Sequence, residues 1–333
     1  MNPRPPIRRR VLALAGALLS LNAVPGAWAA DPYPSRTINL VVPYAPGGST
    51  DLLARQYAQA LGRRLGQTIA VHNKPGANGN IGGMEVVRAK PDGYTLLFGD
   101  LTLATNPSLV RDMPFQPMRD LTPIVPVGHA PLALLVNPNK TPFKSVRDLI
   151  DFAHAHAGEL TNGTAGNGNL GHLGFEVFKL AAKVEIRQVP YKGSGPAVTD
   201  LAGGQISMVM TGLSGTEGYL ESGHLRALAI TGTERSQQYP QIPTLSEATG
   251  LPLPELNLGS WWGVFGPAGL ATDVVARLNE ASIQAISDPE TVARLHRMNA
   301  RPSPGSPQVL REQLKSETET WGRIIRQIGL QPN

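Results

Sequence analysis

The segment INLVVPYAPGGSTDLLAR, residues 38–55, has the clearest structural pattern in the chain. Residues 38–43 form a short apolar run rich in β-branched side chains, which predicts a buried strand. Two glycines follow, and apolar residues then recur at helical spacing from Leu52 onward, with Ser49 or Thr50 available as the helix N-cap. A strand, a glycine-rich turn and a helix in this order predict the first unit of an α/β fold.

The same alternation of strand and helix patterns continues along the chain. Strands are predicted at 69–72 and 94–98 and a helix at 82–89, a βαβαβ order typical of a mostly parallel sheet. Repeated prolines interrupt the pattern between 100 and 125, where we predict a loop. Further strands are predicted at 132–136, 160–164, 186–190, 206–210 and 225–231, and helices at 145–157, 172–182 and 196–202. Three more helices are predicted to begin near Thr272, Pro289 and Pro307. Two α/β lobes with a helical C-terminal segment are the simplest account.

The composition of the 333-residue chain narrows the functional classes. Cysteine is absent, which excludes a disulfide framework, cysteine-ligated metal centres and a thiol nucleophile. The formal net charge is +5, but four arginines precede residue 30, where no acid occurs. Without those four, 26 basic side chains stand against 25 acidic ones. A nearly neutral body is a poor nucleic-acid binder, because phosphate contacts need a clustered cationic face.

Residues 1–29 have the three parts of a secretory signal peptide. A basic segment ends at Arg10, an apolar run follows from 11 to 24, and Ala27-Trp28-Ala29 forms a small-x-small cleavage site. The apolar run is short for a membrane-spanning helix, which disfavours an uncleaved anchor. We therefore expect a mature protein that begins near Ala30 and is exported to the periplasm.

Two glycine-rich loops are candidate binding sites. The first, residues 46–51, joins the first predicted strand to its helix, and Asp51 could cap that helix or bind a ligand amine. The second, GNGNLG at 166–171, has the G-x-G-x-x-G spacing of a dinucleotide site. The next strand ends at 189–191 without the acid that would hold a ribose, which argues against a dinucleotide. Each loop then predicts either an anion site on backbone N–H groups or a tight turn that needs glycine.

Catalytic patterns are weak. There is no G-x-S-x-G or H-E-x-x-H motif, and His154 and His156, two residues apart on a predicted helix, point to different faces. We predict no catalytic residue, metal ligand or cofactor. The pair Trp261-Trp262 is more typical of packing than of a ligand cleft.

Residues 38–55 resemble the opening of the Bug/TctC family of periplasmic solute-binding proteins, and further blocks match that family in order. The matching blocks are NKPGA (73–77), GNIG (79–82), PDGYTLL (91–97), VPYKG (189–193), LRALA (225–229), PTLSEA (243–248) and WWGVFGP (261–267). Each motif is ordinary alone, but their shared order over residues 33–329 is specific.

The resemblance implies a two-lobe Venus-flytrap architecture similar to type II periplasmic binding proteins. It implies a non-enzymatic, monomeric receptor that encloses a small carboxylate for uptake or sensing: a dicarboxylate, tricarboxylate, amino acid or aromatic acid. Expected partners are the membrane subunits of a tripartite tricarboxylate transporter or a sensor kinase. With the strand pattern, it suggests residues 30–125 and 232–333 for the first lobe and 126–231 for the second.

The resemblance also assigns site residues, with the carboxylate held by backbone amides and waters. They are Tyr44, Pro46, Gly47, Gly48 and Asp51 in the first lobe, and Thr164, Gly166, Gly168, Asn169 and His172 in the second. Five positions depart from the usual family residues and leave the ligand's identity open: Asn167, Asn169, Ser207 and the pair Thr211-Gly212.

Two other functions are retained as alternatives. An exported hydrolase on similar lobes would alter its ligand, whereas a binding protein would return it unchanged. A subunit that only contacts a transporter or sensor would bind no solute.

Overall fold

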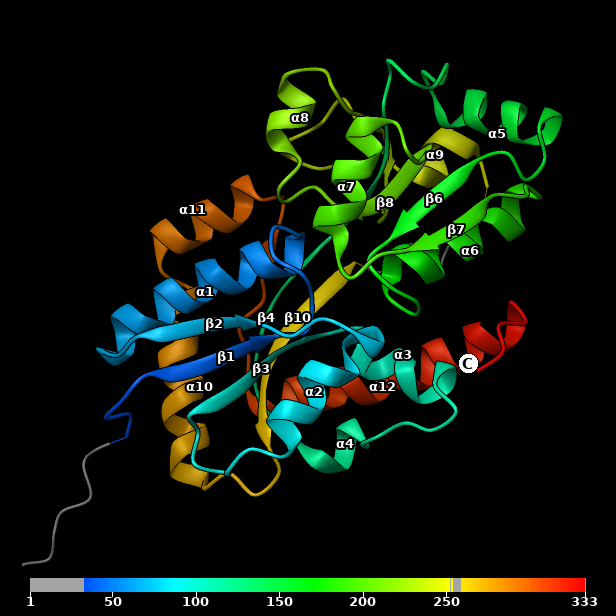
Figure 1. Cartoon of the computed structure of the whole chain (residues 1–333). Helices are drawn as coiled ribbons and strands as arrows, with labels where there is room; N and C mark the ends of the chain where they lie inside the picture. The colour runs from blue at the N-terminus through cyan, green and yellow to red at the C-terminus, as the bar shows by residue number, and fades with distance from the viewer. Residues whose placement is uncertain (1–32, 252, 254–258, 333) are drawn as a thin grey trace, which may run out of the picture. The chain divides into compact units, whose positions relative to one another are not determined.

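The structure is a computed structural model that describes residues 33–251, 253 and 259–332 (Figure 1). The predicted signal peptide, residues 1–29, lies outside the described residues. The chain from Arg36 onward packs as one unit. Among the described helices, none is both long and apolar enough to cross a lipid bilayer.

The first sheet has the strand order β11-β4-β10-β3-β1-β2. Its strands are β1 (Ile38–Val42), β2 (Ile69–Asn73), β3 (Thr95–Asp100), β4 (Leu121–Ala130), β10 (Ser260–Pro267) and β11 (Arg301–Pro302). β1 pairs in parallel with β2 and β3, whereas β10 runs antiparallel to both β3 and β4. The βαβαβ order up to β3 is confirmed, but the complete sheet is mixed rather than mostly parallel.

The second sheet has the strand order β7-β6-β8-β5-β9. Its strands are β5 (Leu132–Val136), β6 (Thr161–Thr164), β7 (Arg187–Pro190), β8 (Met208–Gly212) and β9 (Arg226–Ile230). β6 is parallel to β7 and β8, and β5 is antiparallel to β8 and β9. All five lie within two residues of the predicted ranges. The predicted α/β class with two sheets is confirmed.

Helices cover both faces of the sheets (Figure 1). In the first half of the chain they are α1 (Ser49–Leu65), α2 (Asn80–Val87), α3 (Thr102–Leu109), α4 (Pro117–Asp120), α5 (Val146–Ala155) and α6 (Leu170–Ala182), with a short 3₁₀ turn η2 (Ala77–Gly79). In the second half they are α7 (Ser194–Gly203), α8 (Glu217–Glu221), α9 (Leu245–Thr249), α10 (Thr272–Ile286), α11 (Pro289–Arg297) and α12 (Pro307–Gln327).

Alternating side chains on the strands explain this double covering. Along β5, Leu132, Leu134 and Val136 join one apolar cluster, whereas Ala133 and Leu135 join another, which contains the apolar side chains of α7. A strand buried on both faces is apolar throughout, as the sequence LALLV is.

Local capping signals predicted some helix starts well and one wrongly. α5 begins with the expected capping box, in which Ser145 and Asp148 bond each other's backbone N–H groups. α11 and α12 each carry proline in the first turn, as predicted. The N-cap of α1 is Gly48, not Ser49 or Thr50, and no side chain caps that end.

The prediction of a loop between 100 and 125 is wrong, because that segment contains α3, α4 and the start of β4. α3 accommodates Pro107 near its C-terminal end, and α4 begins with Pro117. In β4, Pro123 and Pro126 lie opposite Phe265 and Gly263, beside two register shifts in the pairing with β10. Bulges tolerate proline because the regular hydrogen-bond ladder is already interrupted there.

The chain passes between the sheets twice, at residue 131 and between residues 231 and 259. Within the second passage, Thr244 forms a bridge with Ile230, and α9 follows directly, so this part lies against the second sheet. The lobe boundaries given above stay a prediction.

Candidate functional site

A small cavity of about 50 Å³ lies where strands of the two sheets end. From the first sheet it is lined by Tyr44, just after β1, and by Asp100, the last residue of β3. From the second sheet it is lined by Ala165, just after β6, and by Thr211 near the end of β8. Open α/β sheets bind ligands at the carboxyl ends of their parallel strands. The cavity is therefore at the position where this fold class places a site.

Three helices begin at this cavity. Gly48 to Asp51 come from the start of α1, Asn169 to Gly171 from the start of α6, and Ser194 is the first residue of α7. The first N–H groups of a helix have no partners within it and carry partial positive charge. Of the described residues that line the cavity, none is an arginine, lysine or histidine. An anion here would be bound by backbone and hydroxyl donors.

Asp51 holds the first loop in place. One oxygen of its carboxylate accepts the Gly47 N–H at 3.0 Å and the Arg55 Nε–H at 3.0 Å, and the other accepts Asn73 Nδ2 at 2.8 Å. Burial raises the pKa of Asp51, but these hydrogen bonds and the charge of Arg55 outweigh burial and lower it below its ordinary value. Asp51 is therefore an ionised carboxylate whose charge is already balanced.

The first loop packs closely against the start of α7. The Ala45 N–H donates to the Lys192 carbonyl at 2.8 Å, and the Ser49 N–H donates to Ser194 Oγ at 3.2 Å. A β-carbon at Gly48 would lie 2.5 Å from Ser194 Oγ and 3.2 Å from the Gly195 nitrogen. Gly48 therefore permits an approach between two segments that any larger residue would obstruct.

The second loop is held by its own side chains. The Gly168 N–H donates to His172 Nδ1 at 3.1 Å, and the His172 N–H donates to Asn169 Oδ1 at 3.0 Å. Gly166 and Gly168 have φ values of 124° and 81°, which confirms the tight-turn interpretation for both. Burial lowers the pKa of His172; Glu176 raises it and Lys179 lowers it, with a net decrease. A neutral imidazole is what the acceptor role of Nδ1 requires.

Asp100 forms a second acidic group in the cavity. Its Oδ1 accepts the Thr102 N–H at 3.0 Å and the Thr102 hydroxyl at 2.6 Å. The Tyr44 hydroxyl lies beside both, 3.4 Å from Thr102 Oγ1. Burial raises the pKa of Asp100, although its hydrogen bonds lower it in part. Burial and the charge of Asp100 together raise the pKa of Tyr44.

Trp262 also lines the cavity, and its indole Nε1 donates to Thr50 Oγ1 at 3.1 Å. The sequence favoured a packing role for this residue. The side chain is buried and serves as packing, but it also fixes a hydroxyl at the start of α1.

The predicted site residues fall into three groups in the structure. Tyr44, Gly48, Asp51 and Asn169 line the cavity. Pro46 and Gly47 line a neighbouring pocket together with Gly48, Ser194 and Gly195. Thr164, Gly166, Gly168 and His172 are not among the described lining residues of either pocket; they build the second loop.

Sequence reasoning missed three polar lining residues: Asp100, Ser194 and Ser260. Asp100 could have been found, because it follows a predicted strand parallel to β1, and parallel strands end at the same edge. Ser194 and Ser260 carried no comparable signal.

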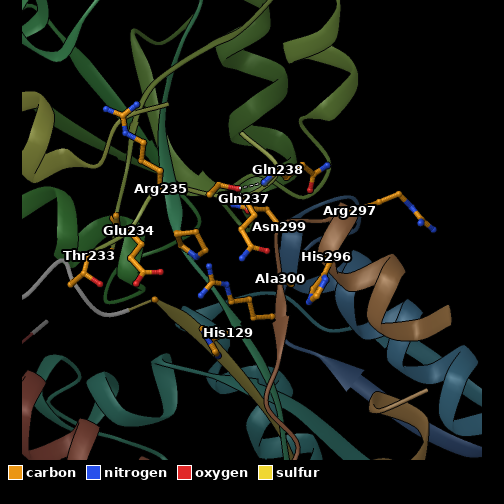
Figure 2. A pocket seen from close by; sticks show the side chains of 16 residues that line it. His129, Thr233, Glu234, Arg235, Gln237, Gln238, His296, Arg297, Asn299 and Ala300 are labelled. Atoms are coloured by element: carbon orange, nitrogen blue, oxygen red, sulfur yellow. Dashed lines mark hydrogen bonds between the residues drawn. The ribbon is translucent and has the colours of Figure 1, made fainter. Parts of the chain in front are cut away.

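A larger pocket of about 520 Å³ lies beside the two passages between the sheets (Figure 2). It is lined by His129, Pro131, residues 231–238, Gly259 and residues 296–301, apart from Met298. Figure 2 shows Arg235 and Arg297 pointing away from each other, and Arg235 already pairs with Glu247 at 2.9 Å. These two arginines do not converge on a common point, whereas Arg301 lines the pocket together with His129.

The described residues contain no cluster of three or more histidine or acidic side chains that could hold a metal ion.

Comparison with known proteins gives one family. Residues 53–330 match the tripartite tricarboxylate transporter family receptor, TctC. The chain is 35% identical to protein BugT of Bordetella pertussis over 322 residues, which cover 96% of this chain and 98% of BugT. Among solved structures, Rpa4515 of R. palustris with adipate is 34% identical, with a TM-score of 0.86 over 90% of this chain and 100% of that one. MatC from Rhodopseudomonas palustris with bound malate is 30% identical, with a TM-score of 0.82 over 88% of this chain and 100% of that one.

Proposed function

Because the chain belongs to the tripartite tricarboxylate transporter receptor family, we propose that its cavity at the strand ends binds a small carboxylate. The chain is a solute-binding protein with the two-lobe flytrap fold of its structural neighbours. The observation that carries the proposal is the meeting of three helix starts, α1, α6 and α7, at a cavity whose described lining contains no basic side chain. The N–H groups at those starts suit a carboxylate.

The ligands of two neighbours support this class of solute, since one was solved with adipate and the other with malate. Neither the family nor these neighbours support the hydrolase alternative, and we propose that the chain has no catalytic activity. A receptor of this kind meets its solute outside the inner membrane. We therefore propose export to the periplasm after removal of residues 1–29, and delivery to transporter membrane subunits or to a sensor kinase.

Ligand capture requires the first loop and the start of α7 to move apart. A cavity of about 50 Å³ has room for little more than one or two water molecules. A carboxylate of several carbons can therefore enter only when the contact between the first loop and α7 opens. We call the arrangement in which the first loop contacts the start of α7 closed, and the one in which they are apart open. A ligand favours the closed arrangement only if it interacts better with it than with the open one.

A thermal-shift screen of the exported protein against carboxylates, with neutral sugars and simple amines as controls, tests this function. A carboxylate at a hundred times its Kd stabilises the fold by about 2.7 kcal/mol. We expect a shift of several degrees for one or a few carboxylates and none for the controls. A shift with sugars alone would contradict the proposal, and so would a ligand recovered in altered form. Protein that neither retains a solute from expression nor binds one in the screen would also contradict it.

A further inference from the structure

Asp100 is an acidic side chain placed where a carboxylate ligand is expected. It is only 6% exposed, it ends β3, and it lines the cavity together with Tyr44. Asp51 lines the same cavity, but its charge is balanced by Arg55 at 3.0 Å. In the part of the chain that the structure describes, no ion pair involves Asp100, and no basic side chain lines the cavity beside it.

Burial raises the pKa of Asp100, but the groups around it include donors that can hold its ionised form. Its Oδ1 accepts two hydrogen bonds from Thr102, and the Tyr44 hydroxyl donates to Thr102 Oγ1 at 3.4 Å. Thr102 begins α3, so the carboxylate lies beside the positive end of that helix. These donors stabilise the ionised carboxylate, and a cation placed beside it would lower its raised pKa.

A buried carboxylate without a counter-ion is costly, and a ligand that brought only carboxylates would add like charge to the same space. A ligand that also carries a cation would remove both problems, because its charge would balance Asp100 while its carboxylate uses the helix starts.

We propose that the ligand of this cavity carries a protonated amine beside its carboxylate, and that Asp100 binds that ammonium group. The inference rests on the proposed function and narrows the solute class to amino acids and similar zwitterions. Asp100 is then a specificity-determining residue of this chain.

Matched ligand pairs test the inference. Calorimetric titrations would compare each amino acid with the same molecule lacking its amino group: aspartate with succinate, glutamate with glutarate, phenylalanine with 3-phenylpropionate, and so on through the protein amino acids. We expect the amino acid of at least one pair to bind ten times or more tightly than its partner, the order of a charged hydrogen bond.

The variant Asp100→Asn separates a role in binding from a role in folding. Its side-chain oxygen can still accept from Thr102, while its amide presents N–H donors in place of negative charge. We expect the preference for the amino acid to fall at least tenfold, with an unfolding midpoint close to that of the wild type. Asp112→Asn makes the same charge change at an exposed position away from the cavity and should leave the preference intact.

The outcomes separate this inference from the function beneath it. If simple carboxylates bind and amino acids do not, or if Asp100→Asn keeps an amino acid's full advantage, the inference is wrong and the proposed function stands. If no carboxylate of either kind binds and none is recovered from the protein, the proposed function fails, and the inference fails with it.

Discussion

Two aspartates of the same cavity differ because of their neighbours. Asp51 and Asp100 are both buried, but a guanidinium and two further donors hold Asp51, whereas only neutral donors meet Asp100. Burial raises the pKa of both; at Asp51 the hydrogen bonds and the charge of Arg55 outweigh burial, and at the more deeply buried Asp100 its hydrogen bonds do not. Asp51 could be assigned from the sequence, because it follows a glycine loop. The contrast with Asp100 depends on Arg55 and Asn73, whose approach no local pattern reveals.

Replacing Asp51 with asparagine tests its role in holding the first loop. Asp51→Asn loses the ion pair with Arg55 and places an amide where the Gly47 N–H or Asn73 needs an acceptor. Arg55 is 46% exposed, so solvent screening reduces the loss, and we expect about 1–2 kcal/mol of destabilisation. Urea unfolding measures this against Asp112→Asn, which should match the wild type. Equal stability of the two variants would contradict a structural role for Asp51.

The lowered pKa of His172 predicts a pH dependence of stability. The ordinary pKa of histidine is about 6.5. At pH values below it, the unfolded chain binds the imidazole proton more readily than the folded chain does. The contribution of neutral His172 is therefore complete above that pH and is lost as the pH falls through the lowered folded value. Thermal melts between about pH 7 and pH 5 should show a steeper loss for the wild type than for His172→Gln. Parallel curves would contradict it.

At the scale of elements, several helices with local caps and the apolar strands of the second sheet could be predicted, whereas the capping box of α9 and the strand β10 were missed. The capping box of α5 and the prolines of α11 and α12 lie in the sequence itself. β10 was not predicted, because the segment WWGVFGP has no alternation and becomes a strand through pairing with β3 and β4. For the same reason the prolines of β4 indicated a loop, although bulges opposite β10 accommodate them.

Gly47 and Gly48 are adjacent, but the structure requires glycine at each for a different reason. Gly47 has a φ of 84° and open space where a β-carbon would lie, so alanine would cost about 1 kcal/mol through the backbone alone. Gly48 has an ordinary φ of −87°, but its β-carbon would collide with the start of α7. Only a substitution at Gly48 therefore obstructs the closed contact between the first loop and the start of α7.

This difference gives a matched pair of variants. Gly48→Ala should weaken binding of the screened carboxylate by about tenfold or more, because overpacking of a tight contact costs about 1–3 kcal/mol. Gly47→Ala should lower stability by a similar small amount to Gly48→Ala but keep most of the affinity. Calorimetry with both variants measures the two effects. Equal loss of affinity in both would contradict closure at Gly48.

At the scale of the whole molecule, the site exists only because segments far apart in the sequence meet. Ser49 Oγ donates to the Gly212 carbonyl at 3.2 Å, and Thr105 Oγ1 donates to the Gly168 carbonyl at 2.7 Å. The glycine loops themselves were predictable from strand–loop–helix patterns. Their meeting depends on two passages of the chain between sheets, and residue spacing carries no signal for it.

The central claim is that the first N–H groups of α1, α6 and α7 bind a carboxylate. The most direct test is a crystal structure of the protein with the carboxylate that gives the largest thermal shift. We predict carboxylate oxygens within hydrogen-bonding distance of N–H groups at two or more of these helix starts, directly or through one water. A carboxylate bound on arginine side chains elsewhere, such as those beside the larger pocket in Figure 2, would contradict the claim.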